Sequence, residues 1–263
     1  MNEDRLSQIR QHLYSHGLVT IQELSALTGA SLPTIRRDLQ RLEEDGVIER
    51  VHGGAKIVSD FTTELAFELR EKKQLVAKRA IANAAYELLV PNSTIFMDAG
   101  TTVLQLARKI RLSPLPLTVF TNSLAISQEL ISVPDVSVLL LGGKLRPENL
   151  SVVGPLAELM LDRLWFDQVF MGLSAVGAEG TMFSIDLHEA TLNARTLARA
   201  TKKIVLADAS KFGTLATYAV AHLQDMDRII TDAKLSQDWL SRLSNMDVHL
   251  TVANPDQEAE SIE

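Results

Sequence analysis

Residues 31–55 read SLPTIRRDLQRLEEDGVIERVHGGA, and the fold of the first part of this chain can be predicted from their pattern. At about 100° per residue, Ile35, Leu39 and Leu42 fall on one side of a helix, which predicts a buried apolar stripe. The opposite side carries three guanidinium groups and one amide, from Arg36, Arg37, Arg41 and Gln40. A guanidinium group can bind a phosphate or guanine and an amide suits adenine, so this face is suited to DNA.

Two helices are expected before this one and a hairpin after it. Apolar residues recur at helical spacing in the first helix, at Leu6, Ile9 and Leu13. Thr20 can cap a short second helix that Gly29 ends, and Ser31 can cap the third, which Gly46 ends. Val47, Ile48 and Val51, with polar residues between them, then suggest a short hairpin or wing, and residues 52–55 break this pattern. A short helix, a tight turn and a second helix with a basic outer face form the helix-turn-helix arrangement.

Two other interpretations of the same pattern remain open at this point. Charged helix faces usually contact water, so the segment could be an ordinary solvated three-helix bundle. It could also be an interaction module that binds another helix. Salt separates these interpretations, because DNA binding should weaken with a log–log slope of about −0.9 per phosphate contact.

The motifs TIRRDL at residues 34–39 and RVHGGA at residues 50–55 resemble the DNA-binding signature of the DeoR family of bacterial repressors. The resemblance implies a winged helix-turn-helix, with residues 52–55 at the junction from wing to linker. The residues expected at DNA are Ser31, Thr34, Arg36, Arg37, Gln40, Arg41 and His52. Leu32 and Pro33 occupy variable positions, so the operator sequence is not predicted.

Composition narrows the class of protein. The 263 residues carry a net charge of −7, which by itself argues against a nucleic-acid partner. Residues 1–58 hold 7 basic and 8 acidic residues, however, so a net −6 lies in the rest of the chain. The absence of Cys excludes disulfides, thiolate catalysis and Cys-ligated metals. No apolar run is long enough to span a bilayer and no signal-peptide core is present, so we expect a cytoplasmic protein without a membrane partner.

From about residue 76 short apolar runs alternate with helical stretches. The runs cover residues 93–100, 117–123, 136–143, 167–175, 202–210, 227–233 and 248–253. Near-continuous apolar strands joined by helices predict an α/β domain with a mainly parallel sheet covered on both faces. The expected domains are 1–58 for DNA binding, 59–75 as linker, 76–255 for effector binding and oligomerisation, and 256–263 as an acidic tail.

Polar residues follow several of these runs, at the strand ends where open α/β sheets bind ligands. Asp98-Ala99-Gly100-Thr101-Thr102 leads into a helix, and such a turn suits a phosphate. Asn122, Gly142-Gly143 and Lys211 follow other strands. Each loop alone is weak, since a Gly-Thr-Thr turn is more often a helix cap and Gly-Gly a tight turn. Their recurrence at one edge favours a binding site.

The resemblance extends over these loops. DAGTT at residues 98–102, TNS at 121–123, LLGG at 140–143 and SKFG at 210–213 are similar to the sensor domain of the same family. That domain resembles the ribose-phosphate isomerase and glucosamine-phosphate deaminase fold, which implies a phosphorylated sugar as effector. The implied effector-binding residues are Asp98, Gly100, Thr101, Thr102, Asn122, Gly142, Gly143, Glu189 and Lys211. The sequence departs from the family pattern before Glu189 and at Arg195, where the variable part of the ligand is expected.

An isomerase-like enzyme fused to a DNA-binding module is the alternative, because Asp98, Glu189 and Lys211 could serve proton transfer. We expect a transcriptional repressor of a carbohydrate-catabolism operon instead, with no catalytic residue, cofactor or metal. It should act as a homo-oligomer, dimer or tetramer, because paired half-sites multiply affinity. An apolar group is expected in the core, with a subunit interface as alternative: Met160, Leu161, Trp165, Phe166, Phe170 and Met171.

Overall fold

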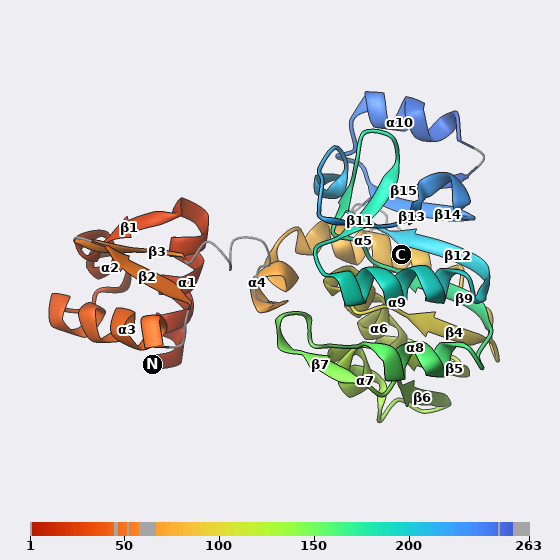
Figure 1. The fold of residues 1–263 in the computed structure, drawn as a ribbon, viewed down its shortest axis with the longest axis horizontal. Helices are drawn as coiled ribbons and strands as arrows, with labels where there is room; N and C mark the ends of the chain where they lie inside the picture. The colour runs from red at the N-terminus through yellow and green to blue at the C-terminus, as the bar shows by residue number, and fades with distance from the viewer. Residues whose placement is uncertain (1, 45–46, 52, 58–66, 247, 255–263) are drawn as a thin grey trace, which may run out of the picture. The chain divides into compact units, whose positions relative to one another are not determined.

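The computed structural model describes residues 2–44, 47–51, 53–57, 67–246 and 248–254. The chain divides into two compact units, Met1–Leu65 and Ala66–Glu263 (Figure 1). No helix in these described ranges is both long enough and apolar enough to cross a lipid bilayer.

The N-terminal unit is a winged helix-turn-helix. Its helices are α1 (Asn2–His16), α2 (Ile21–Thr28) and α3 (Leu32–Glu44). Its sheet has the order β1-β3-β2, formed by β1 (Leu18–Thr20), β2 (Ile48–Val51) and β3 (Gly54–Ile57). One apolar cluster joins these elements and includes the expected helical stripes: Leu6, Ile9, Leu13, Val19, Leu24, Ile35, Leu39, Leu42, Ile48 and Ala55.

Local chemistry fixes the turn between α2 and α3. Thr20 accepts a hydrogen bond from the Glu23 amide, and the Glu23 carboxylate accepts one from the Thr20 amide, which forms a capping box. Gly29 ends α2 in the left-handed conformation with φ of 68°. Both expected helix boundaries are confirmed. The expected end of α3 at Gly46 lies outside the described residues.

The expectation that residues 52–55 join the wing to the linker is wrong, because Gly54 and Ala55 belong to the central strand β3. Gly53 has φ of +83° and turns the chain between β2 and β3. A Cβ at Gly54 would lie 2.3 Å from the Val19 carbonyl oxygen, so β1 and β3 approach closely only with glycine there. His52 lies outside the described residues.

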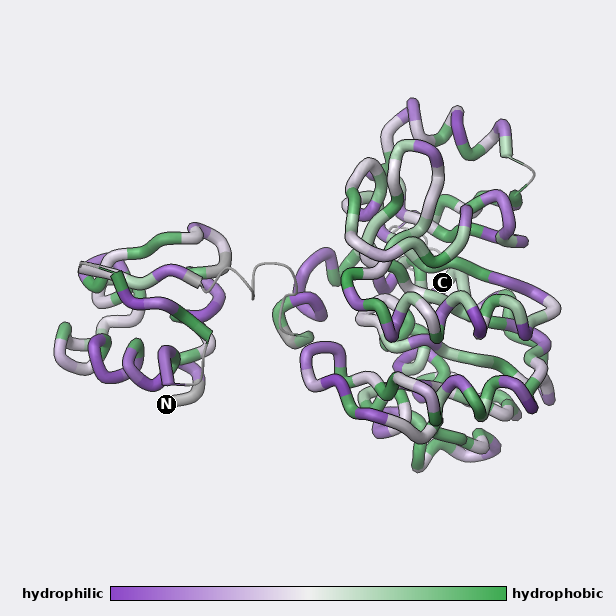
Figure 2. Tube along the Cα trace, viewed as in Figure 1, coloured by the Kyte–Doolittle hydropathy of each residue, from purple (hydrophilic) through white to green (hydrophobic). Residues whose placement is uncertain are grey.

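A seven-stranded parallel sheet forms the centre of the C-terminal unit, and each of the seven predicted apolar runs supplies one strand. The order is β15-β14-β12-β9-β4-β5-β6. The strands are β4 (Thr94–Met97), β5 (Leu117–Thr121), β6 (Val136–Leu140), β9 (Phe166–Met171), β12 (Ala200–Leu206), β14 (Arg228–Asp232) and β15 (His249–Ala253). The strands at its centre are drawn mainly in the hydrophobic colour in Figure 2. The predicted α/β class is confirmed.

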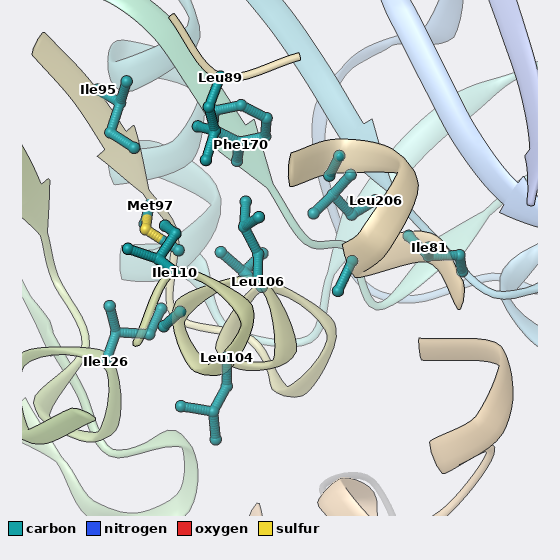
Figure 3. Close-up of a cluster of buried hydrophobic side chains, with 14 of the residues drawn as sticks. Ile81, Leu89, Ile95, Met97, Leu104, Leu106, Ile110, Ile126, Phe170 and Leu206 are labelled. Atoms are coloured by element: carbon teal, nitrogen blue, oxygen red, sulfur yellow. The ribbon is translucent and has the colours of Figure 1, made fainter. Parts of the chain in front are cut away.

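Helices cover both faces of this sheet. One face packs against α5 (Leu75–Tyr86), α6 (Thr101–Leu112) and α7 (Leu124–Leu130). The other packs against α8 (Pro155–Leu161), α9 (Leu187–Leu197) and α10 (Gln237–Ser244). Figure 3 shows the first layer, where Leu106 and Ile110 of α6 point toward the strand side chains Met97 and Phe170. Burial on both faces explains why these strands are almost wholly apolar.

Shorter elements surround the sheet and were not expected from the sequence. The strands are β7 (Lys144–Arg146), β8 (Ser151–Val153), β10 (Ala175–Val176), β11 (Thr181–Ser184) and β13 (Tyr218–His222). The helices are α4 (Phe67–Lys72), η2 (Pro147–Asn149), η3 (Ala209–Lys211) and η4 (Leu223–Asp225). Helix α4 falls within the segment 59–75 that was expected as linker, and the tail 256–263 lies outside the described residues.

The expected core group is buried only in part. Leu161, Phe166, Phe170 and Met171 are fully buried. Trp165 is 59% exposed and Met160 39% exposed, so placing these two in the core is wrong for the chain as described. Trp165 sits in the connection to β9, where its indole N–H donates to the Thr201 hydroxyl at 2.9 Å. The hydrogen bond ties the ring to the start of β12, outside the core.

Candidate functional site

The outer face of α3 carries the polar groups that the helical pattern predicted there. Arg36, Arg37, Gln40 and Arg41 are all exposed. Gln40 donates from its amide to the Glu44 carboxylate at 3.0 Å. The three guanidinium groups have no hydrogen-bond or ion-pair partner in the described part of the chain. Three unpaired arginines on one helix face give a concentrated positive surface on a chain whose total charge is negative.

Polar contacts within the unit hold this helix in place. Asp38, on the inner side of α3, accepts two hydrogen bonds from the Arg5 guanidinium of α1, at 2.7 and 3.2 Å. The hydroxyl groups of Ser31 and Thr34 lie 2.8 Å apart at the start of α3. The sequence analysis missed Asp38, because the helical period identifies buried apolar residues and not a buried carboxylate among them. Its place between Ile35 and Leu39 on the same side of the helix was the available signal.

The second group of polar residues lies where the strand order of the large sheet reverses. The chain runs from β4 through β5 to the β6 edge, then returns to β9 on the other side of β4. The carboxyl ends of β4 and β9 therefore meet at the switch point of the strand order, the usual ligand position in such sheets. Asp98 follows β4, and its amide donates to the Phe170 carbonyl of β9 at 3.0 Å.

Asp98 and Asn122 come together as expected at this position. The Asn122 amide nitrogen donates to Asp98 Oδ1 at 3.4 Å, and Asn122 Oδ1 accepts from the Ala99 amide at 2.8 Å. Asp98 is only 3% exposed. Burial, and then repulsion by Glu189, raise the pKa of Asp98 to about 8, although hydrogen bonds from Asn122 and from backbone amides oppose the shift. Near neutral pH this carboxyl is therefore largely protonated and can donate a hydrogen bond.

Glu189 forms the other acidic part of the site. It sits in the first turn of α9 and is buried. One of its oxygens, Oε1, accepts from the Asn149 amide at 2.6 Å and the Ser151 hydroxyl at 2.7 Å. Arg146 lies 3.1 Å from the same oxygen. The sequence predicted Glu189 and missed the other three, which lie in and beside the β7–β8 hairpin that no periodic pattern revealed.

Three cationic side chains gather beside this network. Arg70 of α4 donates to Asn149 Oδ1 at 2.5 Å, and the Lys78 ammonium of α5 donates to the Arg70 carbonyl. The pKa of Lys78 is lowered to about 8, mainly by burial; the charges of Lys211 and Arg70 add to this shift, and Asp208 opposes it. Burial likewise lowers the pKa of Lys211, with Asp208 raising it. Lys211 was predicted; Arg70 and Lys78 were missed because both lie on helices and not at strand ends.

The Gly100-Thr101-Thr102 turn begins α6 beside Asp98. Gly100 takes the N-cap position without a side-chain cap, and Thr101 and Thr102 are buried in the first turn. The first amides of a helix lack partners within it, and the helix dipole favours an anion there. The geometry therefore presents amide and hydroxyl donors next to a buried carboxyl group.

Not every predicted residue touches this network. Gly142 and Gly143 follow β6; Gly142 contacts Met160, and a Cβ at Gly143 would lie 2.6 Å from the Val153 carbonyl oxygen. That close approach explains why a glycine is required at position 143, without invoking any role in ligand binding. Arg195 pairs with Glu158 and Asp162 of the neighbouring helix region, at 3.4 and 3.6 Å.

Each of the two units matches a known protein family. Residues 5–61 match the family described as DeoR-like helix-turn-helix domain, and residues 73–233 match the DeoR C terminal sensor domain. A putative aga operon transcriptional repressor of Escherichia coli O157:H7 is 34% identical over 94% of this chain and 92% of its own length. The HTH-type transcriptional regulator GlpR of Haloferax volcanii is 38% identical over 83% of this chain and 85% of its own.

Solved structures are less similar. Ribose 5-phosphate isomerase A from Methanocaldococcus jannaschii has a TM-score of 0.38 and 17% identity, covering 51% of this chain and 53% of that one. The translation initiation factor eIF-2B of Pyrococcus horikoshii has a TM-score of 0.42 and 13% identity, covering 82% and 74%. The extent of the two family matches decides the assignment: the chain belongs to the DeoR family of DNA-binding transcriptional regulators.

Proposed function

We propose that the protein is a repressor of a carbohydrate-catabolism operon in the cytoplasm, controlled by a phosphorylated sugar bound at the sheet switch point. One observation carries the proposal: the guanidinium of Arg70 donates to Asn149, which in turn donates to the buried Glu189. The Lys78 ammonium donates to the Arg70 carbonyl, and the charge of Lys211 acts on Lys78. Cationic groups are thus linked to polar groups that would suit the hydroxyl groups of a sugar. A sugar phosphate has the same division between an anionic end and a hydroxylated end.

The cationic cluster suits a dianion. Burial is the main cause of the lowered pKa of Lys78, and the like charges of Lys211 and Arg70 add to it. Asp208 offsets part of it, and an arriving phosphate would offset the rest through charge-assisted hydrogen bonds. Thr101 and Thr102, with the unpaired amides of α6, would complete the phosphate contacts.

The hydroxyl groups of the sugar would meet the other half of the site. Asn122 and Glu189 offer donors and acceptors there, and Asp98 can donate when protonated. Gly100, Gly142 and Gly143 stay in the proposal as backbone positions along the rim. Lys211 remains the predicted residue that we expect to contribute most to phosphate affinity.

Operator DNA would bind at the N-terminal unit through Ser31, Thr34, Arg36, Arg37, Gln40 and Arg41. One recognition helix contacts only a few base pairs, so we expect a homo-oligomer on paired half-sites. The effector must bind the DNA-competent and DNA-incompetent conformations with different affinity, otherwise it could not change repression. We expect sugar phosphate to release DNA.

A thermal-shift screen tests the effector. Purified full-length protein is heated with matched pairs of phosphorylated and unphosphorylated sugars. A sugar phosphate at 100 times its dissociation constant should stabilise the sensor unit by about 2.7 kcal/mol, and its unphosphorylated partner should not. Lys211→Ala should abolish the shift, while Lys234→Ala, an exposed lysine in the same unit, should keep it. Equal shifts in both variants would remove Lys211 from the site, and no shift with any sugar phosphate would reject this effector class.

An isomerase-like activity is the second candidate, because a carboxyl group with a pKa of about 8 beside Glu189 suits proton transfer. The relatives are named as transcriptional regulators, which favours sensing. Incubation of the effector with the protein, followed by product analysis, separates the two. Turnover on the order of 1 per second or faster would support the enzyme.

A further inference from the structure

Helix α8 is apolar on its outward side as well as on its inward side. Its sequence is PLAELML, with Glu158 as the single charged residue. Ala157 and Leu161 are buried against the sheet. Leu156 and Leu159 nevertheless point outward, 66% and 61% exposed. A surface helix normally turns a polar face to water, so an all-round apolar helix indicates that something covers it.

Strand β6 lies at the end of the sheet order and has a neighbour, β5, on one side only. Its sequence, VSVLL, contains no charge and no proline. Natural edge strands usually carry such residues, because an unblocked edge pairs with other strands. This edge is open to pairing.

The exposed edge and the helix form one surface. The amide of Gly142, just after β6, points to the Met160 sulfur of α8 at 3.2 Å. Alternation along the strand places Leu139 on the same side of the sheet as the buried Leu141, which packs in the α8 layer. Leu139, Leu156, Leu159 and Met160 make up what we term the α8–β6 surface.

The two carboxylates on and just after α8 have partners within the chain. Glu158 pairs with Arg195 at 3.4 Å, and Asp162 pairs with Arg195 and Arg199 at 3.6 and 3.4 Å. A net charge of −7 disfavours the approach of two copies in general. At this face the carboxylates next to α8 have arginine partners, so a second copy would meet little like-charge repulsion.

We propose that the α8–β6 surface is the contact between two copies of this chain, formed by antiparallel pairing of the two β6 strands with α8 packed against α8. A two-fold contact of this kind is self-complementary, because each strand meets an identical edge and each apolar helix face an identical face. The inference rests on the proposed function, which requires paired DNA-binding units. It adds the surface that pairs them.

Light scattering on the full-length protein at about 10 µM tests the surface. Wild-type protein should be a dimer or larger, and Leu159→Glu should halve the mass. Leu112→Glu is the matched control, since Leu112 is an apolar residue at the end of α6, 81% exposed. The unfolding transition of the sensor unit in calorimetry should persist in both variants, which shows that this unit is folded.

Cysteine cross-linking provides an independent test, because the chain has no cysteine of its own. Ser137→Cys, Val138→Cys and Leu139→Cys are oxidised one at a time. In an antiparallel pair only residues near the two-fold axis face their own copy, at a Cα separation of about 4.5–5.5 Å that a disulfide can bridge. One position should therefore give a cross-linked dimer at high yield, and Leu112→Cys should not.

The outcomes distinguish an error in the assigned surface from an error in the pairing of copies itself. If Leu159→Glu keeps the wild-type mass and no β6 cysteine cross-links, the copies pair elsewhere and only the assignment of this surface is overturned. A monomeric wild-type protein would overturn both this surface and the pairing in the proposed function. In that case a normal thermal shift with a sugar phosphate would leave the sensor proposal standing.

Discussion

The outer face of α3 and the strand-end site of the sheet use polar residues in opposite ways. The arginines of α3 are exposed and unpaired in the described part of the chain, whereas Asp98, Asn122 and Glu189 are buried and bonded to neighbours. Exposed charges cost the fold almost nothing, so α3 is free to vary for recognition. Buried polar groups must be satisfied, so the sensor site is part of the fold that carries it.

The difference also matches the size of each ligand. A DNA duplex is a rigid polyanion that meets an exposed convex helix, and affinity comes from phosphate contacts summed over a broad surface. A small anion needs several donors converging on one point, which buried strand ends and a helix N-terminus can supply. Substitutions should therefore separate: on α3 they should change binding alone, and in the sheet they should change binding and stability.

Gly54→Ala should have the largest effect and break the N-terminal unit. The new Cβ would meet the Val19 carbonyl oxygen at 2.3 Å, so β1 and β3 must separate, at a cost of about 3 kcal/mol. Calorimetry should show a lowered transition for this unit and an unchanged one for the sensor. Gly53→Ala is the comparison, since it strains a positive φ without a clash and should cost about 1 kcal/mol. Equal losses would mean that strain, not contact, governs this turn.

Asp98→Asn should alter the pH dependence of stability in the sensor unit. A carboxyl whose folded pKa is about 8, against 3.8, binds its proton more tightly in the folded state. Its stabilising contribution is complete below pH 4 and is lost as the pH rises toward 8. Wild-type stability should thus fall by about 2 kcal/mol between pH 6 and 8, and the variant should not show this loss. Urea unfolding at each pH measures it, with the exposed Asp225→Asn as control. Parallel profiles for wild type and Asp98→Asn would contradict the raised pKa.

Arg37→Ala should weaken operator binding about tenfold, which is about 1.4 kcal/mol, and leave the unfolding midpoint unchanged. The guanidinium is exposed, so its removal leaves no buried group without a partner. Fluorescence anisotropy at several salt concentrations measures affinity and salt slope together. Arg79→Ala removes an exposed arginine from the sensor unit and should leave operator affinity unchanged. Matching losses in both variants would indicate a general charge effect instead of a recognition helix.

Thr101→Val should have the smallest effect, about a fivefold loss of effector affinity, or about 1 kcal/mol. The substitution keeps the shape of a buried side chain and removes one hydroxyl donor from the start of α6. Isothermal titration measures the affinity. Thr118→Val is the control, because Thr118 lies near the amino end of β5, at the opposite end of the strand from the site residue Asn122. An unchanged titration for Thr101→Val would make this threonine part of the helix start alone.

The sequence alone identified the seven strands of the sheet, the helical stripe of α3 and the capped turn before it, because each depends on local periodicity or on one short-range contact. It also located Asp98, Asn122, Glu189 and Lys211 as candidates, since strand ends are visible in a sequence. The sequence analysis missed the wing strand β3, because Gly53 and Gly54 suggested a break in the chain. The close approach of β1 in fact requires a glycine at position 54.

Contacts between elements that are distant in the sequence determine the other features of the site and the core. Arg70, Lys78 and Asn149 join the site only because α4, α5 and the β7–β8 hairpin fold back over the sheet end. Trp165 and Met160 were predicted in the core but are exposed, because an apolar side chain does not by itself indicate which side of its helix or strand is covered by other elements. Periodicity encodes which side chains share a face. Which faces meet, and therefore which charges share a buried volume, depends on packing between elements distant in the sequence.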